Sequence, residues 1–219
     1  MTLELYALLE RARAFEGRSV EEIAALARAG APSGGRSTKG KVGELLERVL
    51  GATGGSGERV VDFPSLGLEL KSIPITEQGK VLESTFVCAV RVDEEVDFDA
   101  SWVRKKLTRV LFVPIVGQRG SPLPSRRVGA AVLWEPSAAQ LAELRADYDD
   151  IMGLIGIGRM EDVSGHLGKY LQLRPKARDG SPRAVAFGRE GERIRTVPRG
   201  FYLRPKLTEA LLRDPLAMP

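Results

Sequence analysis

The strongest constraint on the fold is a change of pattern that follows the glycine-rich stretch at residues 51–57. Before it, apolar residues recur every three or four positions, which predicts two helices in the first thirty residues and a third over about 41–50. After it, five segments are typical of strands: VVDF, LGLELKSIPI, STFVCAVRV, RVLFVPIVG and RVGAAVLW. We therefore expect an α/β (α+β) fold in which helices flank a mixed sheet.

Three further helices are expected among and after these strands. The stretch SWVRKKLTR predicts a short basic helix capped by Ser101. Apolar spacing predicts a long helix over 137–155, whose acids, Asp147, Asp149 and Asp150 among them, are assigned to its solvated side. Beyond residue 158 we expect short strands and turns, and a small helix at LTEALL.

Composition limits the kind of site and its location. The chain has 219 residues, of which 43% are hydrophobic, enough for a substantial core. Neither a membrane-length apolar run nor a signal-peptide pattern is present, so we expect a cytoplasmic protein without membrane association. A single cysteine, Cys88, and a single histidine, His166, exclude an internal disulfide and argue against zinc or Cys/His catalysis. Any metal would be held by oxygen atoms.

Basic residues are concentrated near the end of the chain. Residues 174–206 contain ten lysines and arginines against three acids, a net charge of +7, whereas the whole chain carries only +4. This distribution favours a surface that binds a polyanion, and phosphates are the obvious partner. A solvated basic surface without a ligand is the alternative that charge alone leaves open.

The stretch DFPSLGLELKSIPI contains the residues best suited to chemistry. Residues two apart in a strand share a face, so Glu69 and Lys71 lie together, opposite an apolar face formed by Leu68, Leu70 and Ile73. A turn at residues 64–67 can bring Asp62 beside them. Two carboxylates next to an ammonium suit Mg²⁺ and a phosphodiester substrate, although an ordinary surface ion pair would have the same spacing.

An acid, six intervening residues and then ExK form a pattern that resembles the PD-(D/E)xK nuclease superfamily. The segments VGELLERVLGA, DFPSLGLELKSIPI, LESTFVCAV, VRKKLTRVLFVPI and YLQLRPKA…RGFYL, in this order, are similar to the MutH family of DNA mismatch-repair endonucleases. The resemblance implies a single restriction-endonuclease-like domain over 1–219. It further implies an N-terminal lobe at about 1–100 and a C-terminal, DNA-reading lobe at about 101–219, around a DNA-binding cleft.

The same resemblance implies roles for particular residues. Asp62, Glu69 and the carbonyl of Leu70 would bind one or two Mg²⁺ ions, and Lys71 is the lysine of the motif. Glu47 would complete the acidic cluster, a choice over Glu44 that periodicity alone does not make. The matching lysine in VRKKL is Lys106, expected near the scissile phosphate.

Family function implies a substrate and a partner. MutH proteins nick the unmethylated strand at hemimethylated GATC sites and are activated by MutL, and we expect a monomer. The implied DNA-contacting residues are Arg174, Pro175, Lys176, Tyr202 and Phe86. Two alternatives stay open at this point: a stand-alone type II restriction endonuclease of the same fold, and a DNA-binding module that has lost catalysis.

Overall fold

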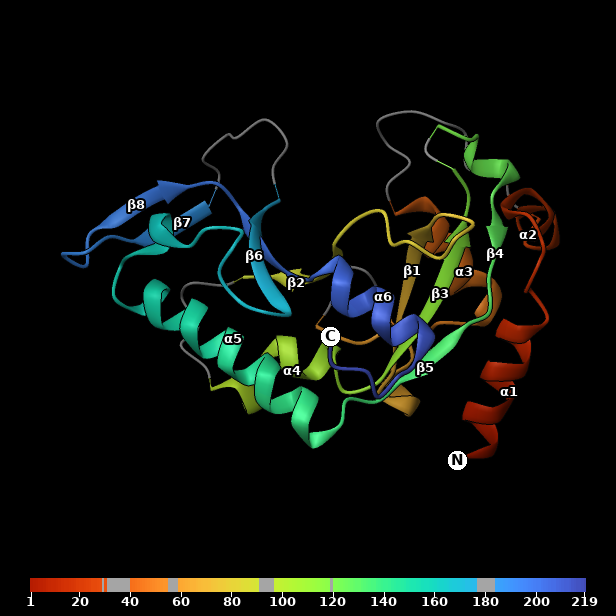
Figure 1. The fold of residues 1–219 in the computed structure, drawn as a ribbon, viewed down its shortest axis with the longest axis horizontal. Helices are drawn as coiled ribbons and strands as arrows, with labels where there is room; N and C mark the ends of the chain where they lie inside the picture. The colour runs from red at the N-terminus through yellow and green to blue at the C-terminus, as the bar shows by residue number, and fades with distance from the viewer. Residues whose placement is uncertain (29, 31–39, 55–58, 91–96, 119, 177–183) are drawn as a thin grey trace.

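The structure is a computed structural model that describes residues 1–28, 30, 40–54, 59–90, 97–118, 120–176 and 184–219. Its strands form two main sheets and a separate two-stranded hairpin. Figure 1 shows the first sheet at one end of the molecule, the hairpin at the other end, and the second sheet between them. The protein thus has the mixed α/β architecture expected from its sequence.

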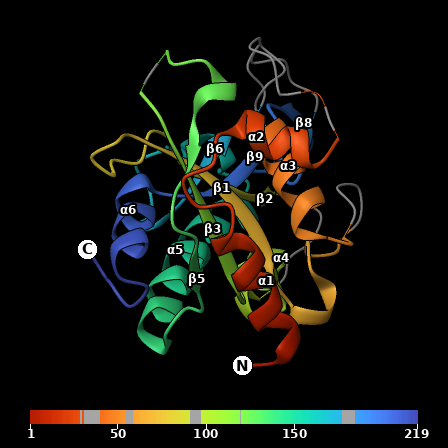
Figure 2. The same cartoon turned by 90° about the vertical axis from the view of Figure 1, so that its right-hand side faces the viewer.

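The first sheet is built around strand β3 (Val110–Val116). Strand β1 (Glu69–Ile75) runs parallel to β3, while β4 (Arg127–Val128) and β5 (Val132–Trp134) pair with it antiparallel. Helices α1 (Leu3–Arg13), α2 (Val20–Leu26) and α3 (Lys41–Leu50) cover one face of this sheet, as Figure 2 shows. The sheet is therefore mixed, and β1 is an edge strand of the sheet, next to β3.

The second sheet is antiparallel, in the order β2 (Thr85–Ala89), β9 (Arg199–Leu203), β6 (Leu171–Pro175). The hairpin that follows β6 in the chain consists of β7 (Ala184–Phe187) and β8 (Arg193–Thr196). The remaining elements are helices α4 (Trp102–Lys106), α5 (Ala138–Gly156) and α6 (Pro205–Arg213), and 3-10 turns at Pro64–Leu66, Phe98–Ala100, Leu123–Ser125 and Met160–Asp162.

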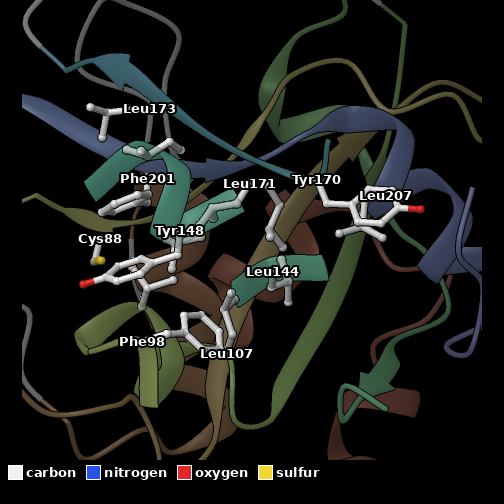
Figure 3. Close-up of a cluster of buried hydrophobic side chains, with 14 of the residues drawn as sticks. Cys88, Phe98, Leu107, Leu144, Tyr148, Tyr170, Leu171, Leu173, Phe201 and Leu207 are labelled. Carbon is white, nitrogen blue, oxygen red and sulfur yellow. The ribbon is translucent and has the colours of Figure 1, made fainter. Parts of the chain in front are cut away.

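Two hydrophobic cores lie on opposite faces of β3. Leu111 and Val113 pack with the three N-terminal helices, whereas Val110 and Phe112 pack into a second core with α5 and the second sheet. Strand β3 is buried on both faces, which explains its unbroken apolar sequence. Figure 3 shows part of the second core, where the Tyr148 and Phe201 rings are stacked with centroids 5.4 Å apart and Cys88 lies close by.

Most of the expected elements are confirmed. The third helix covers residues 41–50 as predicted, and Ser19 and Ser137 form capping boxes with residues three positions later in α2 and α5. Ser101 caps α4 by accepting a hydrogen bond from the Arg104 amide. These features depend only on residues close together in the chain, which is why local patterns predict them.

Three details of the expected strands are wrong. The segment VVDF forms no strand. The Asp62 carbonyl accepts hydrogen bonds from the earlier residues Thr53 and Gly54, its carboxylate accepts one from the later residue Leu70, and Pro64 begins a 3-10 turn. The segment RVGAAVLW forms two short strands, interrupted where the Gly129 amide bonds the carbonyl of Pro114. Ile73 packs into the second core, on the opposite face of β1 from Leu70, so it does not share the apolar face that Leu70 forms with Leu68 just before the strand.

The assignment of Asp147 to the solvated side of its helix is also wrong. Its side chain is 5% exposed and accepts hydrogen bonds from the backbone amides of Lys169, Tyr170 and Leu171. Asp149 and Asp150 are exposed, as expected. Asp147 therefore joins α5 to the start of β6, a role that helical periodicity could not indicate because its partners lie in another part of the chain.

The chain passes back and forth between the two sheets. Strand β2, at residues 85–89, belongs to the second sheet, and β3, β4 and β5, at 110–134, belong to the first. A lobe boundary near residue 100 therefore does not coincide with the division between the sheets. Within the described ranges, none of the helices is long and apolar enough to cross a membrane.

Candidate active site

Asp62 is fixed at the edge of the first sheet by its backbone and its side chain. Its carbonyl accepts hydrogen bonds from the amides of Thr53 and Gly54, both at 3.0 Å, which ties it to the segment after α3. A Cβ atom at Gly54 would lie 2.0 Å from the Val61 carbonyl oxygen, so only glycine permits this approach. The Asp62 carboxylate accepts a hydrogen bond from the amide of Leu70 at 2.8 Å. Asp62 is thereby held beside the start of β1.

Glu69 is the most buried charged residue of the site, with only 2% of its surface exposed. One carboxylate oxygen accepts from Lys71 Nζ at 2.7 Å, and the other accepts from Lys106 Nζ at 2.6 Å. The two lysine side chains are 19% and 13% exposed, so all three charges are largely removed from water. A buried carboxylate of this kind is stable only when it is paired, and here two ammonium groups pair it.

Glu47 reaches the same region from α3. It is half-buried, whereas Glu44, one turn earlier, is exposed. Burial raises the pKa of the Glu47 carboxyl, and the negative charges of Asp62 and Glu69 raise it further. The pKa of Asp62 is also raised, first by burial and then by Glu69, against the lowering effect of the Leu70 amide and the two lysines. Three carboxylates thus repel one another across the edge of β1.

This oxygen-rich set fits a hard divalent cation by its chemistry. Carboxylates and a backbone carbonyl are the ligands that Mg²⁺ prefers, and the repulsion that raises the two pKa values is the kind that a bound cation relieves. Within the described residues, however, no three acidic, histidine or cysteine side chains are gathered closely enough to form a metal-binding group. Lys71 and Lys106 neutralise Glu69 in this arrangement.

The position of Lys106 depends on residues that sequence reasoning did not select. Its ammonium group lies 5.2 Å from the centre of the Trp102 ring and 3.5 Å from the carbonyl oxygen of Val60. Trp102 also lies 5.8 Å from the ammonium of Lys105. Trp102 and Lys106 are four positions apart, the spacing that places two side chains on one side of a helix, and this signal could have identified the pair.

The aromatic residues expected to contact DNA lie together on the second sheet. Phe86 on β2 is paired with Tyr202 on β9, and their rings meet edge to face with centroids 5.2 Å apart. The ammonium of Lys176 lies 4.7 Å from the Phe86 ring. Gly200 makes this packing possible, because a Cβ there would lie 2.7 Å from the Phe86 ring. Phe86 and Tyr202 are half-buried rather than part of the core.

The expected basic residues continue from this aromatic pair at the exposed end of β6. Arg174 donates a hydrogen bond to Ser84 Oγ at 3.0 Å, and Pro175 pairs with Arg199 across the sheet. The Lys176 amide donates a hydrogen bond to the Pro198 carbonyl at 2.7 Å. Arg174, Pro175 and Lys176 are all exposed. The predicted site residues therefore form two groups, an acidic group on the first sheet and an aromatic and basic group on the second.

Comparison with known proteins gives a consistent result. A family sequence model described as "DNA mismatch repair enzyme MutH" matches residues 50–147, which include Asp62, Glu69, Lys71, Phe86 and Lys106. The DNA mismatch repair protein MutH of Pectobacterium atrosepticum is 44% identical over 208 residues, 94% of this chain and 90% of the relative. The chain belongs to the MutH family. The MutH proteins of Escherichia coli O6:K15:H31 and Serratia proteamaculans are 44% and 45% identical, each over 94% of this chain and 90% of the relative.

MutH membership decides between the alternatives that the sequence left open. The protein is a DNA mismatch-repair endonuclease, a nuclease that acts on DNA, and not a stand-alone restriction enzyme or a module without catalysis. The family model begins at residue 50, so Glu47 and the residues of β6 and β9 lie outside its match, although the full-length relatives span 94% of the chain.

Proposed function

We propose that this MutH protein nicks the unmethylated strand of DNA at hemimethylated GATC sites in a reaction that depends on Mg²⁺. The observation that carries the proposal is the convergence of Asp62, Glu69 and Lys71 at the edge of β1. Glu47 lies close enough for the negative charges of Asp62 and Glu69 to raise its pKa, beyond the effect of burial. Acidic oxygens beside an ammonium group suit phosphodiester hydrolysis.

In this proposal, Asp62, Glu69 and the Leu70 carbonyl hold the metal, and Glu47 completes the acidic cluster. A divalent ion held by these oxygens supplies Lewis-acid stabilisation of the negative charge on the phosphate. Lys71 orients the attacking water, which forms the new P–O bond as the bond to the leaving oxygen breaks. The water gives up a proton to solvent, and the leaving oxygen takes one up from solvent. Lys106 is released from Glu69 and turns toward the scissile phosphate, where its positive charge offsets the charge of the transition state.

The aromatic and basic group reads the site. Lys176 and Arg174 donate hydrogen bonds to guanine, the commonest contact between a basic side chain and a base edge in the major groove. Pro175 sets the direction of this segment, and Tyr202, supported by Phe86, contacts the adenine whose methylation is sensed. Support comes from the ring contact between Phe86 and Tyr202 and from the position of Lys176 over Phe86.

The proposal also covers the working state of the protein. It acts in the cytoplasm as a monomer that MutL activates, and DNA lies in a cleft between an N-terminal and a C-terminal lobe. The +7 charge of residues 174–206 favours a DNA-binding face on the second of these lobes.

The test uses a duplex with one GATC site that is unmethylated, hemimethylated or fully methylated, in Mg²⁺, with and without MutL and ATP. We expect nicks on unmethylated strands only, and faster nicking when MutL is present. Nicking of the methylated strand would contradict the assignment of Tyr202. Equal rates with and without MutL would remove MutL as the activator, and full activity in excess EDTA would remove the metal.

A further inference from the structure

A hollow of about 510 Å³ lies between the β7–β8 hairpin and the second sheet. Its apolar lining includes Ala89, Val90 and Pro198 from the sheet side. The charged residues that line it are Lys176, Arg193 and Arg199, and no acidic side chain of the described residues takes part. The hollow is therefore cationic around an apolar floor, and its composition favours an anionic ligand.

One face of the β7–β8 hairpin is exposed to solvent and to this hollow, and it carries both apolar and basic side chains. Val185 pairs with Arg195 and Phe187 pairs with Arg193, so these four side chains share one face of the two strands. All four are exposed, Val185 at 51% and Phe187 at 39%, while Ala186 on the other face is buried in the second core. The core thus anchors the hairpin and leaves two arginines and two apolar side chains without a cover.

Arg199 provides a second, independent observation at the same place. One of its terminal nitrogens donates to the Val163 carbonyl at 3.1 Å, but its Nε atom is buried and has no hydrogen-bond partner in the described structure. An unsatisfied buried donor of this kind is costly. A phosphate oxygen entering the hollow could satisfy the guanidinium after a small shift of the side chain.

We propose that the hollow and the exposed face of the β7–β8 hairpin bind the phosphate backbone of the DNA duplex beside the recognition site. Lys176 lies at the junction, since it contacts Phe86 and also lines the hollow. The hairpin projects from the second sheet on the side away from β1, as Figure 1 shows. DNA that crosses the acidic group and Lys176 reaches the hairpin beyond the bases that are read.

The occupant is duplex DNA rather than an acidic protein because of the shape and charge of the element. Arg193 and Arg195 lie two positions apart on one strand and on one exposed face, so they present two positive charges in a row to a line of phosphates. Phosphate contacts carry no sequence information, so they extend the bound length without changing the sequence that is read. The inference rests on the proposed function only where it places the hairpin next to a specific recognition site.

The test compares Arg193→Gln, Arg195→Gln and the double variant with Arg13→Gln, a matched charge removal on α1 at the far end of the molecule. Dissociation constants are measured by fluorescence anisotropy over a range of salt concentrations, without divalent metal. Two duplexes carry a central GATC site with long flanks or with flanks of about half a helical turn, and a third, long duplex lacks the site.

On long duplexes, each single hairpin variant should weaken binding about three- to tenfold and lower the slope of log Kd against log salt by about 1, equally with and without GATC, and the double variant should lower the slope by about 2. On the short duplex the hairpin variants and the parent should bind alike. Arg13→Gln should match the parent throughout. Unchanged slopes on long duplexes would overturn the proposal, and a loss confined to GATC duplexes would make the hairpin a base reader instead. Failure of the parent to prefer GATC would contradict the proposed function without affecting the slopes.

Discussion

Glu69 and Asp147 are both buried carboxylates, 2% and 5% exposed, yet they are held in opposite ways. Asp147 accepts hydrogen bonds of 2.6–2.7 Å from three backbone amides, which belong to the chain entering β6. Glu69 accepts hydrogen bonds from two lysine ammonium groups, one on β1 and one on α4. Backbone donors cannot leave without unfolding the strand, whereas lysine side chains can rotate away. The comparison separates a carboxylate that maintains the fold from one whose partners are exchangeable.

The strongest way to sharpen the comparison is Glu69→Gln. It removes the charge but keeps the size, and we expect nicking to fall about 10²–10³-fold because a proposed ligand of the metal that stabilises the phosphate charge is lost. The two lysine side chains, 19% and 13% exposed, can rotate toward water, so the free energy of unfolding should fall by about 1–2 kcal/mol. This is less than the loss of about 3–5 kcal/mol expected when the remaining charge of a buried ion pair cannot reach water. Single-turnover nicking and urea unfolding measure the two effects.

Glu44→Gln, on the exposed side of α3, serves as the control and should change neither quantity. If Glu69→Gln instead unfolded the protein as readily as loss of a core residue, Glu69 would be as structural as Asp147 and the comparison would fail.

Asp147→Asn should have the opposite profile. The amide group offers one acceptor oxygen in place of two, so at least one buried amide loses its partner, and we expect unfolding to become easier by about 2–4 kcal/mol. Nicking per folded molecule should be unchanged. Urea unfolding followed by the fluorescence of buried Trp134 gives the stability.

Asp150→Asn, an exposed change on the same helix, should stay within about 0.5 kcal/mol of the parent. Labelling of Cys88 offers a second readout, because burial raises the pKa of its thiol to about 12 and only opening of the second core exposes it. Asp147→Asn should speed this labelling, and an unchanged rate would speak against a structural role.

Asp62→Asn tests the smallest effect, the repulsion within the acidic cluster. The folded state raises the pKa of Asp62, so ionised Asp62 destabilises the fold at neutral pH. We expect the variant to be more stable by about 1 kcal/mol at pH 8 while losing activity. This gain should shrink as the pH falls through the raised pKa of the folded state and vanish below about pH 3, where the parent carboxyl is protonated in both states. A gain that persists at low pH would show a cause other than charge.

Local patterns predicted what neighbouring residues determine. Helix α3 and the cap at Ser101 depend on residues within one turn, and both were predicted correctly. The shared face of Glu69 and Lys71 follows from the two-residue period of a strand. The roles assigned to Glu47, Lys106, Tyr202 and their partners came from family resemblance and remain proposals.

Long-range contacts set the limit of that approach. Lys106 and Glu69 are separated by 37 positions, and Asp147 by 22 or more from the amides that it accepts. Neither pairing leaves a periodic signal in the chain. The error at Ile73 has another cause, because the two-residue period of a strand already places Ile73 on the face of Glu69 and Lys71. The structure shows that this face also packs into the second core at Ile73.

The alternation of the chain between the two sheets has a consequence for synthesis on the ribosome. Strand β2 ends at Ala89, but its partner β9 begins only at Arg199, so β2 emerges long before any strand can pair with it. Its apolar side chains and open backbone edge stay exposed until almost the whole chain has been translated. The first sheet can close earlier, after β5, and would give the nascent chain a folded surface while the second sheet is still incomplete.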